Sequence, residues 1–264
     1  MARADAMGNA YPAIPLMAQN GISQMTDRTR EFSPQTYARI AGVLYLINIA
    51  AGLLDEMFVR NAMIVSGDAA ATAANIAHSP LLWRIGIAGD LIMQATDIPL
   101  MMIFYVLLKP VNRNLALTAM LFTLVQTASL VANKMNLMMP LFLSADAEYL
   151  KAFTPDQLHA LAYVAIQAHA HGFGVGLIFF GFECLITGYL IFKSGYLPKI
   201  LGGAMQIAGV CYLVNGFALI LAPAVANALF PAILLPCFFA ELSFCLWLLF
   251  KGVDVSKWEA RTRA

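Results

Sequence analysis

The sequence predicts an all-α integral membrane protein built as a bundle of six transmembrane helices. Of its 264 residues, 61% are hydrophobic and only 12% are charged, whereas soluble domains have about 45–50% apolar and about 25% charged residues. The apolar residues fall into separate runs of about 20, each long enough to cross about 30 Å of hydrocarbon. Because these runs are continuous rather than alternating, they argue against a transmembrane β-barrel.

Turn and cap signals divide the chain into an arm, a membrane domain and a tail. Residues 1–32 are polar and small and lack the apolar core of a signal peptide, so we expect a disordered cytoplasmic arm. Ser33 and Pro34 predict the cap and first turn of a helix, which opens a membrane domain over 33–253. Residues 254–264 are expected as a cytoplasmic tail. The sequence leaves open whether translation starts at Met1 or Met25. The helices are expected at about 34–57, 80–108, 114–143, 155–193, 197–221 and 231–250.

Two further signals refine these elements. Asp68 is placed to cap one small helix between the first two spans. Thr154, Pro155 and Gln157 form the pattern of a capping box, which marks the start of the fourth span. At its expected length this helix must either extend beyond the bilayer or break near Gly172.

The distribution of lysine and arginine predicts the orientation. Positive residues accumulate on the cytoplasmic side of membrane proteins. With six spans and a cytoplasmic N-terminus, 12 of the 16 basic residues lie inside, and both termini are cytoplasmic. The 12 are Arg3, Arg28, Arg30, Arg39, Lys109, Arg113, Lys193, Lys199, Lys251, Lys257, Arg261 and Arg263.

Several stretches of the chain resemble a known family. They are RIAGVLYL (39–46), GDAAATAANI (67–76), LLKPVNR (107–113), HGFGVGLIFFGFE (171–183), GYLIFKSGYLPKILG (188–202) and ELSFCLWLLFKG (241–252). Together they resemble the bacterial family known as domain of unknown function 4386, over about 37–253. The resemblance implies a six-helix protein of the bacterial cytoplasmic (inner) membrane without an assigned activity.

Three acids are expected near the middle of the membrane. Asp97, Glu183 and Glu241 each lie ten or 11 residues from the cytoplasmic end of a helix, about 15 Å from the boundary. Asn48 lies somewhat further out. Since no lysine or arginine is expected at that depth, the three carboxyl groups cannot all be ionised in a low dielectric. Either they are neutral and hydrogen-bond neighbouring helices, or a proton, cation or ligand visits them.

The second span carries a polar stripe. Its members follow helical spacing and precede Pro99, which frees one backbone carbonyl. On the third span Gln126 and Asn133 share a face, and Lys134 matches Asp90 in depth with opposite charge. We therefore expect a Lys134–Asp90 ion pair. The stripe consists of Gly86, Asp90, Gln94 and Asp97.

The stretch QAHAHGFGVGLIFFGFE (167–183) combines packing and polar residues. Small residues that recur every seven positions predict close helix packing, as at Gly174, Gly181 and Gly188. His169 and His171 are two residues apart and point about 200° away from each other, so a regular helix does not offer both to one metal ion. We expect no metal and place His169 at the mouth of a cavity.

Two segments of the chain echo each other. IAGVLYLIN (40–48) and IAGVCYLVN (207–215) agree at seven of nine positions. A duplicated helix pair and chance similarity both explain this agreement.

These observations favour binding or proton-linked transport of a small amphiphilic molecule through an acidic cavity at mid-membrane. The ligand- or proton-binding candidates are Asn48, Asp90, Gln94, Asp97, Lys134, His169, Glu183 and Glu241. Two alternatives stay open: a membrane enzyme acting on a lipid-like substrate through a carboxylate or His169, and a structural or regulatory subunit. No catalytic motif requires an enzyme, no cofactor is expected, and no basic patch indicates nucleic acid. Membrane lipid is an expected partner, and a homo-oligomer stays open.

Overall fold

The computed structural model describes residues 32–263, and over that range the protein is all-α, with no strand. Six of its helices are long and apolar enough to cross a membrane. The predicted class, an all-α integral membrane protein with six spans, is therefore confirmed.

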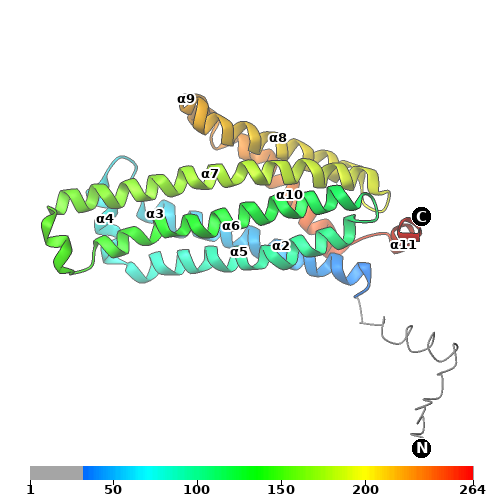
Figure 1. Ribbon diagram of the computed structural model, residues 1–264, viewed down its shortest axis with the longest axis horizontal. Helices are drawn as coiled ribbons and strands as arrows, with labels where there is room; N and C mark the ends of the chain where they lie inside the picture. The colour runs from blue at the N-terminus through cyan, green and yellow to red at the C-terminus, as the bar shows by residue number, and fades with distance from the viewer. Residues whose placement is uncertain (1–31, 264) are drawn as a thin grey trace, which may run out of the picture. The chain divides into compact units, whose positions relative to one another are not determined.

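Consecutive spans run in opposite directions (Figure 1). The first span, Pro34–Met63, is continuous and consists of α2 (Pro34–Asp55), a π-helical turn η1 (Glu56–Arg60) and α3 (Asn61–Met63). The later spans are α5 (Pro80–Leu108), α6 (Arg113–Leu143), α7 (Pro155–Ser194), α8 (Lys199–Leu221) and α10 (Leu235–Phe250). The shorter helices are α4 (Ala69–His78), η2 (Glu148–Ala152), α9 (Pro223–Leu229), η3 (Ala232–Leu234) and α11 (Val255–Arg263). We call the two ends of the bundle the α4 end and the α11 end.

The structure differs from the expected boundaries in three places. The first span reaches Met63 rather than ending near residue 57, because the π-helical turn carries the helix onward. The segment after Ala222, expected as a loop, forms α9, which Pro223 opens. The C-terminal segment, expected only as a tail, contains α11.

Helix α11 is held by a cap and by a contact with α5. The Asp254 carboxylate accepts hydrogen bonds from the hydroxyl of Ser256 at 2.7 Å and the backbone N–H of Lys257 at 3.2 Å. These bonds and the Lys257 side chain lower the pKa of Asp254 to about 2, so the cap is ionised at neutral pH. Trp258 then donates its indole N–H to the carbonyl of Leu107 at 3.0 Å.

Helix α7 extends well beyond its neighbour α8. The predicted capping box is present: Thr154 accepts from the N–H of Gln157, which accepts in return from the N–H of Thr154. The helix then continues unbroken through Gly172 for 40 residues, or about 60 Å. Since α8 has only 23 residues, the α4-end part of α7 has no counterpart from α8 beside it (Figure 1).

Glycines allow α7 and α8 to pack closely. A methyl group added at Gly188 would lie 2.6 Å from the carbonyl oxygen of Gly202, too near for any other residue. The predicted packing role of the α7 glycines is thus confirmed. The ladder pairs Gly174 with Gly216, Gly181 with Gly209 and Gly188 with Gly202.

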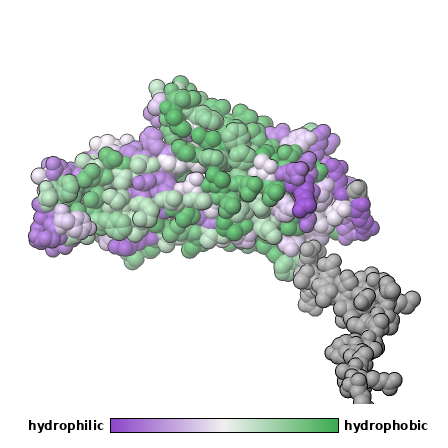
Figure 2. Space-filling view, viewed as in Figure 1, coloured by the Kyte–Doolittle hydropathy of each residue, from purple (hydrophilic) through white to green (hydrophobic). Residues whose placement is uncertain are grey.

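Two apolar cores leave a polar region between them. One, which includes Leu190 and Phe244, lies toward the α11 end, and the other, which includes Trp83 and Leu137, lies toward the α4 end. Along α5 the polar residues Gln94 and Asp97 fall between the two. On the outside, Figure 2 shows mostly apolar side chains over the middle of the visible face and polar ones toward both ends, as expected where the middle faces lipid.

Candidate functional site

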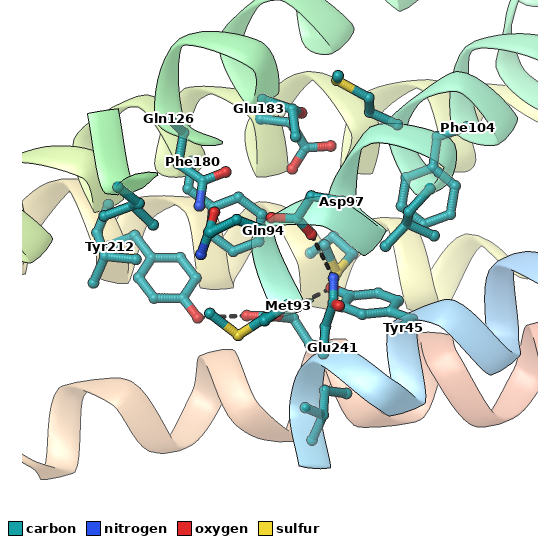
Figure 3. A pocket seen from close by; sticks show the side chains of 18 of the residues that line it. Tyr45, Met93, Gln94, Asp97, Phe104, Gln126, Phe180, Glu183, Tyr212 and Glu241 are labelled. Atoms are coloured by element: carbon teal, nitrogen blue, oxygen red, sulfur yellow. Dashed lines mark hydrogen bonds between the residues drawn. The ribbon is translucent and has the colours of Figure 1, made fainter. Parts of the chain in front are cut away.

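The polar region contains a cavity of about 170 Å³, which we call the acidic chamber. Asp97 of α5, Glu183 of α7 and Glu241 of α10 line it together with aromatic, aliphatic and amide side chains (Figure 3). Three helices that are separate in the chain therefore bring the three predicted acids to one space. Among the described residues that line the chamber, none is a lysine or an arginine.

Asp97 is held by neutral donors. The side-chain amide of Asn48 donates to one carboxyl oxygen, and the hydroxyl of Thr127 lies 3.4 Å from the other. Thr96 donates to the amide oxygen of Asn48 and so fixes the direction of that amide. This network joins α2, α5 and α6 and orients the carboxyl group without neutralising it.

Glu241 is clasped by two tyrosines. Tyr45 of α2 donates to one carboxyl oxygen at 3.0 Å, and Tyr212 of α8 donates to the other (Figure 3). The two tyrosines occupy the same position in the two echoing segments IAGVLYLIN and IAGVCYLVN. The two echoing segments thus place two hydroxyl groups on one acid.

Glu183 is bound more loosely. The hydroxyl of Thr187, one turn further along the same helix, donates to Glu183 at 2.6 Å. The acid is 5% exposed and its carboxyl group faces the chamber. Because this bond comes from its own helix, Glu183 contributes less than Asp97 or Glu241 to holding the helices together.

Two glutamine side chains also line the chamber. Gln94 is 1% exposed, and neither its amide oxygen nor its amide nitrogen has a hydrogen-bond partner among the described residues. The amide oxygen of Gln126, a residue 7% exposed, is likewise unpaired within residues 32–263. Buried polar atoms are nearly always paired in folded proteins, and these amides can hydrogen-bond to a molecule that enters the chamber.

A second, wider cavity of about 690 Å³ adjoins the chamber. Asn48, Met93, Phe173, Tyr212 and Glu241 line both cavities, so the two share a wall. The wide cavity also has two kinds of lining. Phe230 and Leu234 come from the segment between α9 and α10 and Phe238 from the first turn of α10, whereas Glu56, Arg60, Asp90 and His169 come from the first span, α5 and α7.

Three charged residues that line the wide cavity, Glu56, Arg60 and Asp90, form a cluster with Asp55 and Lys134 behind them. Lys134 lies 2.5 Å from Asp90, so the predicted ion pair is confirmed. Arg60 contacts the same carboxylate and also lies 2.5 Å from Asp55 and 3.7 Å from Glu56. We call these five residues the ionic cluster. It holds three carboxylates and two cations.

The two histidines of α7 have different surroundings. His169 is buried, with its Nε2 atom 3.3 Å from the Lys134 ammonium group; since an ammonium group only donates, that nitrogen accepts. His171 is exposed, and its ring nitrogen Nδ1 lies 2.9 Å from the carbonyl oxygen of Gln167. They do not converge on one point. Within residues 32–263, no group of three or more His, Cys, Asp or Glu side chains could hold a metal ion.

The structure distributes the predicted candidates between the two cavities. Most of them line the chamber, while Asp90, Lys134 and His169 lie at or against the wide cavity. The functional role of all eight candidates stays a prediction. Sequence reasoning missed the tyrosines of the clasp, although the two echoing segments contain them at matching positions, and it missed the contacts of Arg60. The chamber candidates are Asn48, Gln94, Asp97, Glu183 and Glu241.

Comparison with known proteins agrees with the resemblance drawn from the sequence. The chain is similar to an uncharacterised protein of Archaeoglobus fulgidus, with 28% identity over 172 residues, which are 65% of this chain and 86% of that protein. No solved structure matches the chain. The family described as "Domain of unknown function (DUF4386)" matches over residues 40–252. That range includes all six spans except the first residues of α2, and the chain therefore belongs to the domain of unknown function 4386 family.

Proposed function

We propose that this protein binds a small amphiphilic molecule in its adjoining cavities and carries it across the membrane linked to protons. The observation that carries the proposal is the double lining of the wide cavity. Its apolar wall of Phe230, Leu234 and Phe238 suits a hydrocarbon portion, and its charged wall suits a polar head. Because Glu241 lines both cavities, a molecule bound in the wide cavity lies against one of the three acids.

The chamber acids support the proton link. A proton or a positive charge must accompany carboxyl groups that a low dielectric surrounds, and no lining residue supplies a cation. The other elements face the acids with the phenols Tyr45 and Tyr212 and, from α6, with neutral Thr123, Gln126 and Leu130. The titratable thiol of Cys184 lies beside Glu183 and that of Cys237 near Glu241. The charged and titratable groups beyond them lie at or against the wide cavity and are Glu56, Arg60, Asp90, Lys134 and His169.

We further propose that the protein resides in the bacterial cytoplasmic membrane with both termini in the cytoplasm. The α11 end carries the larger share of the positive charge, as the cytoplasmic side of a membrane protein does. Its basic residues in the described range are Arg39, Lys109, Arg113, Lys193, Lys199, Lys251, Lys257, Arg261 and Arg263.

Filling the wide cavity tests the binding proposal. Gly52 lines that cavity, and a Cβ atom there meets only the Met93 sulfur, at 3.6 Å, so Gly52→Trp places an indole in the cavity. We expect the full-length protein in lipid nanodiscs to bind the neutral fluorescent amphiphile N-phenyl-1-naphthylamine saturably, and the variant to bind it about tenfold more weakly.

Gly203→Trp is the matched control. Gly203 lines neither cavity, and a Cβ atom there meets nothing within 4 Å. This variant should bind the probe as the unmodified protein does. Equal binding by all three proteins, or no binding beyond that of empty nanodiscs, would refute the proposal.

Replacing the chamber acids Asp97 and Glu241 with their neutral amides tests the proton link. A neutral probe that displaces water from an ionised carboxylate incurs a desolvation cost, so binding of N-phenyl-1-naphthylamine should strengthen as the pH falls from about 8 to about 5. Asp97→Asn and Glu241→Gln remove the ionisable groups and should flatten this dependence. If both variants keep the full pH dependence, the proton link is wrong.

A further inference from the structure

The acidic chamber contains hydrogen-bond acceptors that lack donors. The amide oxygens of Gln94 and Gln126 are buried and unpaired within the described part of the chain. Figure 3 shows both amide groups among the side chains that line the chamber, on the same side as Asp97. Since buried acceptors are nearly always satisfied, two of them facing one cavity indicate that the donor arrives with a ligand.

The chamber also lacks a positive charge. Asp97, Glu183 and Glu241 line it without a lysine or an arginine among its described neighbours. The nearby cations Arg60 and Lys134 already contact Asp55, Glu56 and Asp90, and these three carboxylates outnumber them. The protein therefore places carboxyl groups at this depth without a cation beside them, so the charge of one that ionises is left for an incoming positive group to balance.

The remaining lining suits an organic cation rather than a bare metal ion. Aromatic rings surround the carboxyl groups, and the faces of such rings attract ammonium groups. The volume of about 170 Å³ is close to that of a cavity of about 150 Å³ that accommodates benzene. The rings belong to Tyr45, Phe104, Phe173, Phe180 and Tyr212.

We propose that the molecule bound in the acidic chamber is a protonated amine carrying a small apolar group. Its N–H groups donate to the oxygens of Gln94 and Gln126, its charge is balanced by Glu183, and its apolar group lies among the aromatic rings. This inference rests on the proposed binding function and names the substrate class of the same site. The ionic cluster along the wide cavity has one more carboxylate than cations, so it does not repel a cation on its way in.

Two probes of equal size and different charge test the inference. Benzylamine is a cation at neutral pH, whereas benzyl alcohol is neutral, and both fit a benzene-sized cavity. Isothermal titration of the full-length protein in nanodiscs, corrected with empty nanodiscs, should show benzylamine binding about tenfold more tightly, as expected for charge-assisted hydrogen bonds.

The variant Glu183→Gln then tests whether the charge of Glu183 causes the preference for benzylamine over benzyl alcohol. Because the bond to Glu183 comes from Thr187 of the same helix, this variant leaves the contacts between helices in place. We expect the preference for benzylamine over benzyl alcohol to fall to about parity once the charge is gone. Glu259→Gln removes an exposed carboxylate from α11 and should leave the preference unchanged.

Gln94→Met gives a second readout, which separates binding from folding. The Gln94 amide has no hydrogen-bond partner within residues 32–263, so its removal should not lower the thermal unfolding temperature. Benzylamine affinity should nevertheless fall about fivefold, since the ligand loses an acceptor. Gln206→Met makes the same chemical change outside both cavities and should leave the affinity unchanged.

The outcomes distinguish the two proposals. Equal binding of benzylamine and benzyl alcohol, or a preference that survives Glu183→Gln, overturns the amine inference and leaves the amphiphile proposal standing. Failure of both probes to bind overturns the amine inference alone if Gly52→Trp still weakens N-phenyl-1-naphthylamine binding. If that effect is absent as well, both proposals fall.

Discussion

Asp90 is the residue on which the ionic cluster depends. Its side chain is 2% exposed and contacts both cations, Lys134 and Arg60. A buried carboxylate in this position compensates two positive charges that the membrane interior would otherwise disfavour. Removing the carboxylate and removing one of the cations should therefore have unequal effects.

Asp90→Asn should destabilise the protein more than Lys134→Gln. The first change leaves the Lys134 ammonium group buried beside neutral His169, and loss of one partner from a buried pair costs about 3–5 kcal/mol. The second leaves Asp90 with Arg60, so we expect a smaller cost, about 1–2 kcal/mol. The free energy of unfolding in detergent, measured by SDS titration, checks the order, and a larger loss for Lys134→Gln would contradict it.

At the residue scale, the sequence predicted contacts where depth and charge sufficed. Lys134 and Asp90 lie at matching depths on adjacent spans, so their pairing followed from counting residues along each helix. The clasp on Glu241 did not follow, because depth gives no information on which helices are neighbours. Tyr45 and Tyr212 reach the same acid only because α10 packs against both α2 and α8.

At the scale of elements, α7 and α8 pack against each other through six glycines. In a helix pair this close, the backbones of the two helices are in contact at the glycines, and no side chain fits between them. The spacing of seven residues on α7 was visible in the sequence and predicted a packing stripe. Helix α8 has the same spacing, at Gly202, Gly209 and Gly216, but which glycine of α7 meets which glycine of α8 depends on their antiparallel register, which only the structure shows.

Gly188→Ala should destabilise the protein by about 1–3 kcal/mol, the range for overpacking a tight contact. The new methyl group would lie 2.6 Å from the Gly202 carbonyl oxygen and 2.8 Å from the Gln206 backbone nitrogen. Gly203→Ala is the control, because a Cβ atom there meets nothing within 4 Å and alanine favours a helix by up to about 1 kcal/mol over glycine. The thermal unfolding temperature in detergent should be lower for Gly188→Ala, whereas that of Gly203→Ala should equal or exceed that of the unmodified protein. Equal decreases for the two variants would contradict the packing argument.

At the scale of the whole molecule, hydropathy and caps predicted all six spans, and their ends lay within a few residues of the observed ones. The end of the first span and the helical character of α9 and α11 were not foreseen. The first span continues through a π-helical turn and α9 opens at Pro223, whereas α11 is held by a contact distant in the chain, that of Trp258 with Leu107. From the sequence, only the polar faces of single helices were inferred. The volumes of the cavities could not be, because they depend on how all the helices pack together.

Labelling of engineered cysteines in whole cells tests the orientation. Tyr149→Cys lies in the exposed η2 segment at the α4 end, and Ala260→Cys lies on an exposed position of α11. We expect a membrane-impermeant maleimide to label the first and not the second, as the distribution of basic residues requires. A Cys211→Ser background removes the one native cysteine that is not buried. Labelling of Ala260→Cys in intact cells would reverse the proposed orientation.

The clasp on Glu241 also has a consequence for the order of synthesis. Tyr45 and Glu241 are 196 residues apart in the chain, an interval that takes about 10–40 s to translate at about 5–20 residues per second. During that time α2 is already in the membrane, but the helix that carries its acidic partner does not yet exist. A nascent chain stopped before α10 therefore has two tyrosines without their shared acceptor and a chamber that lacks one wall.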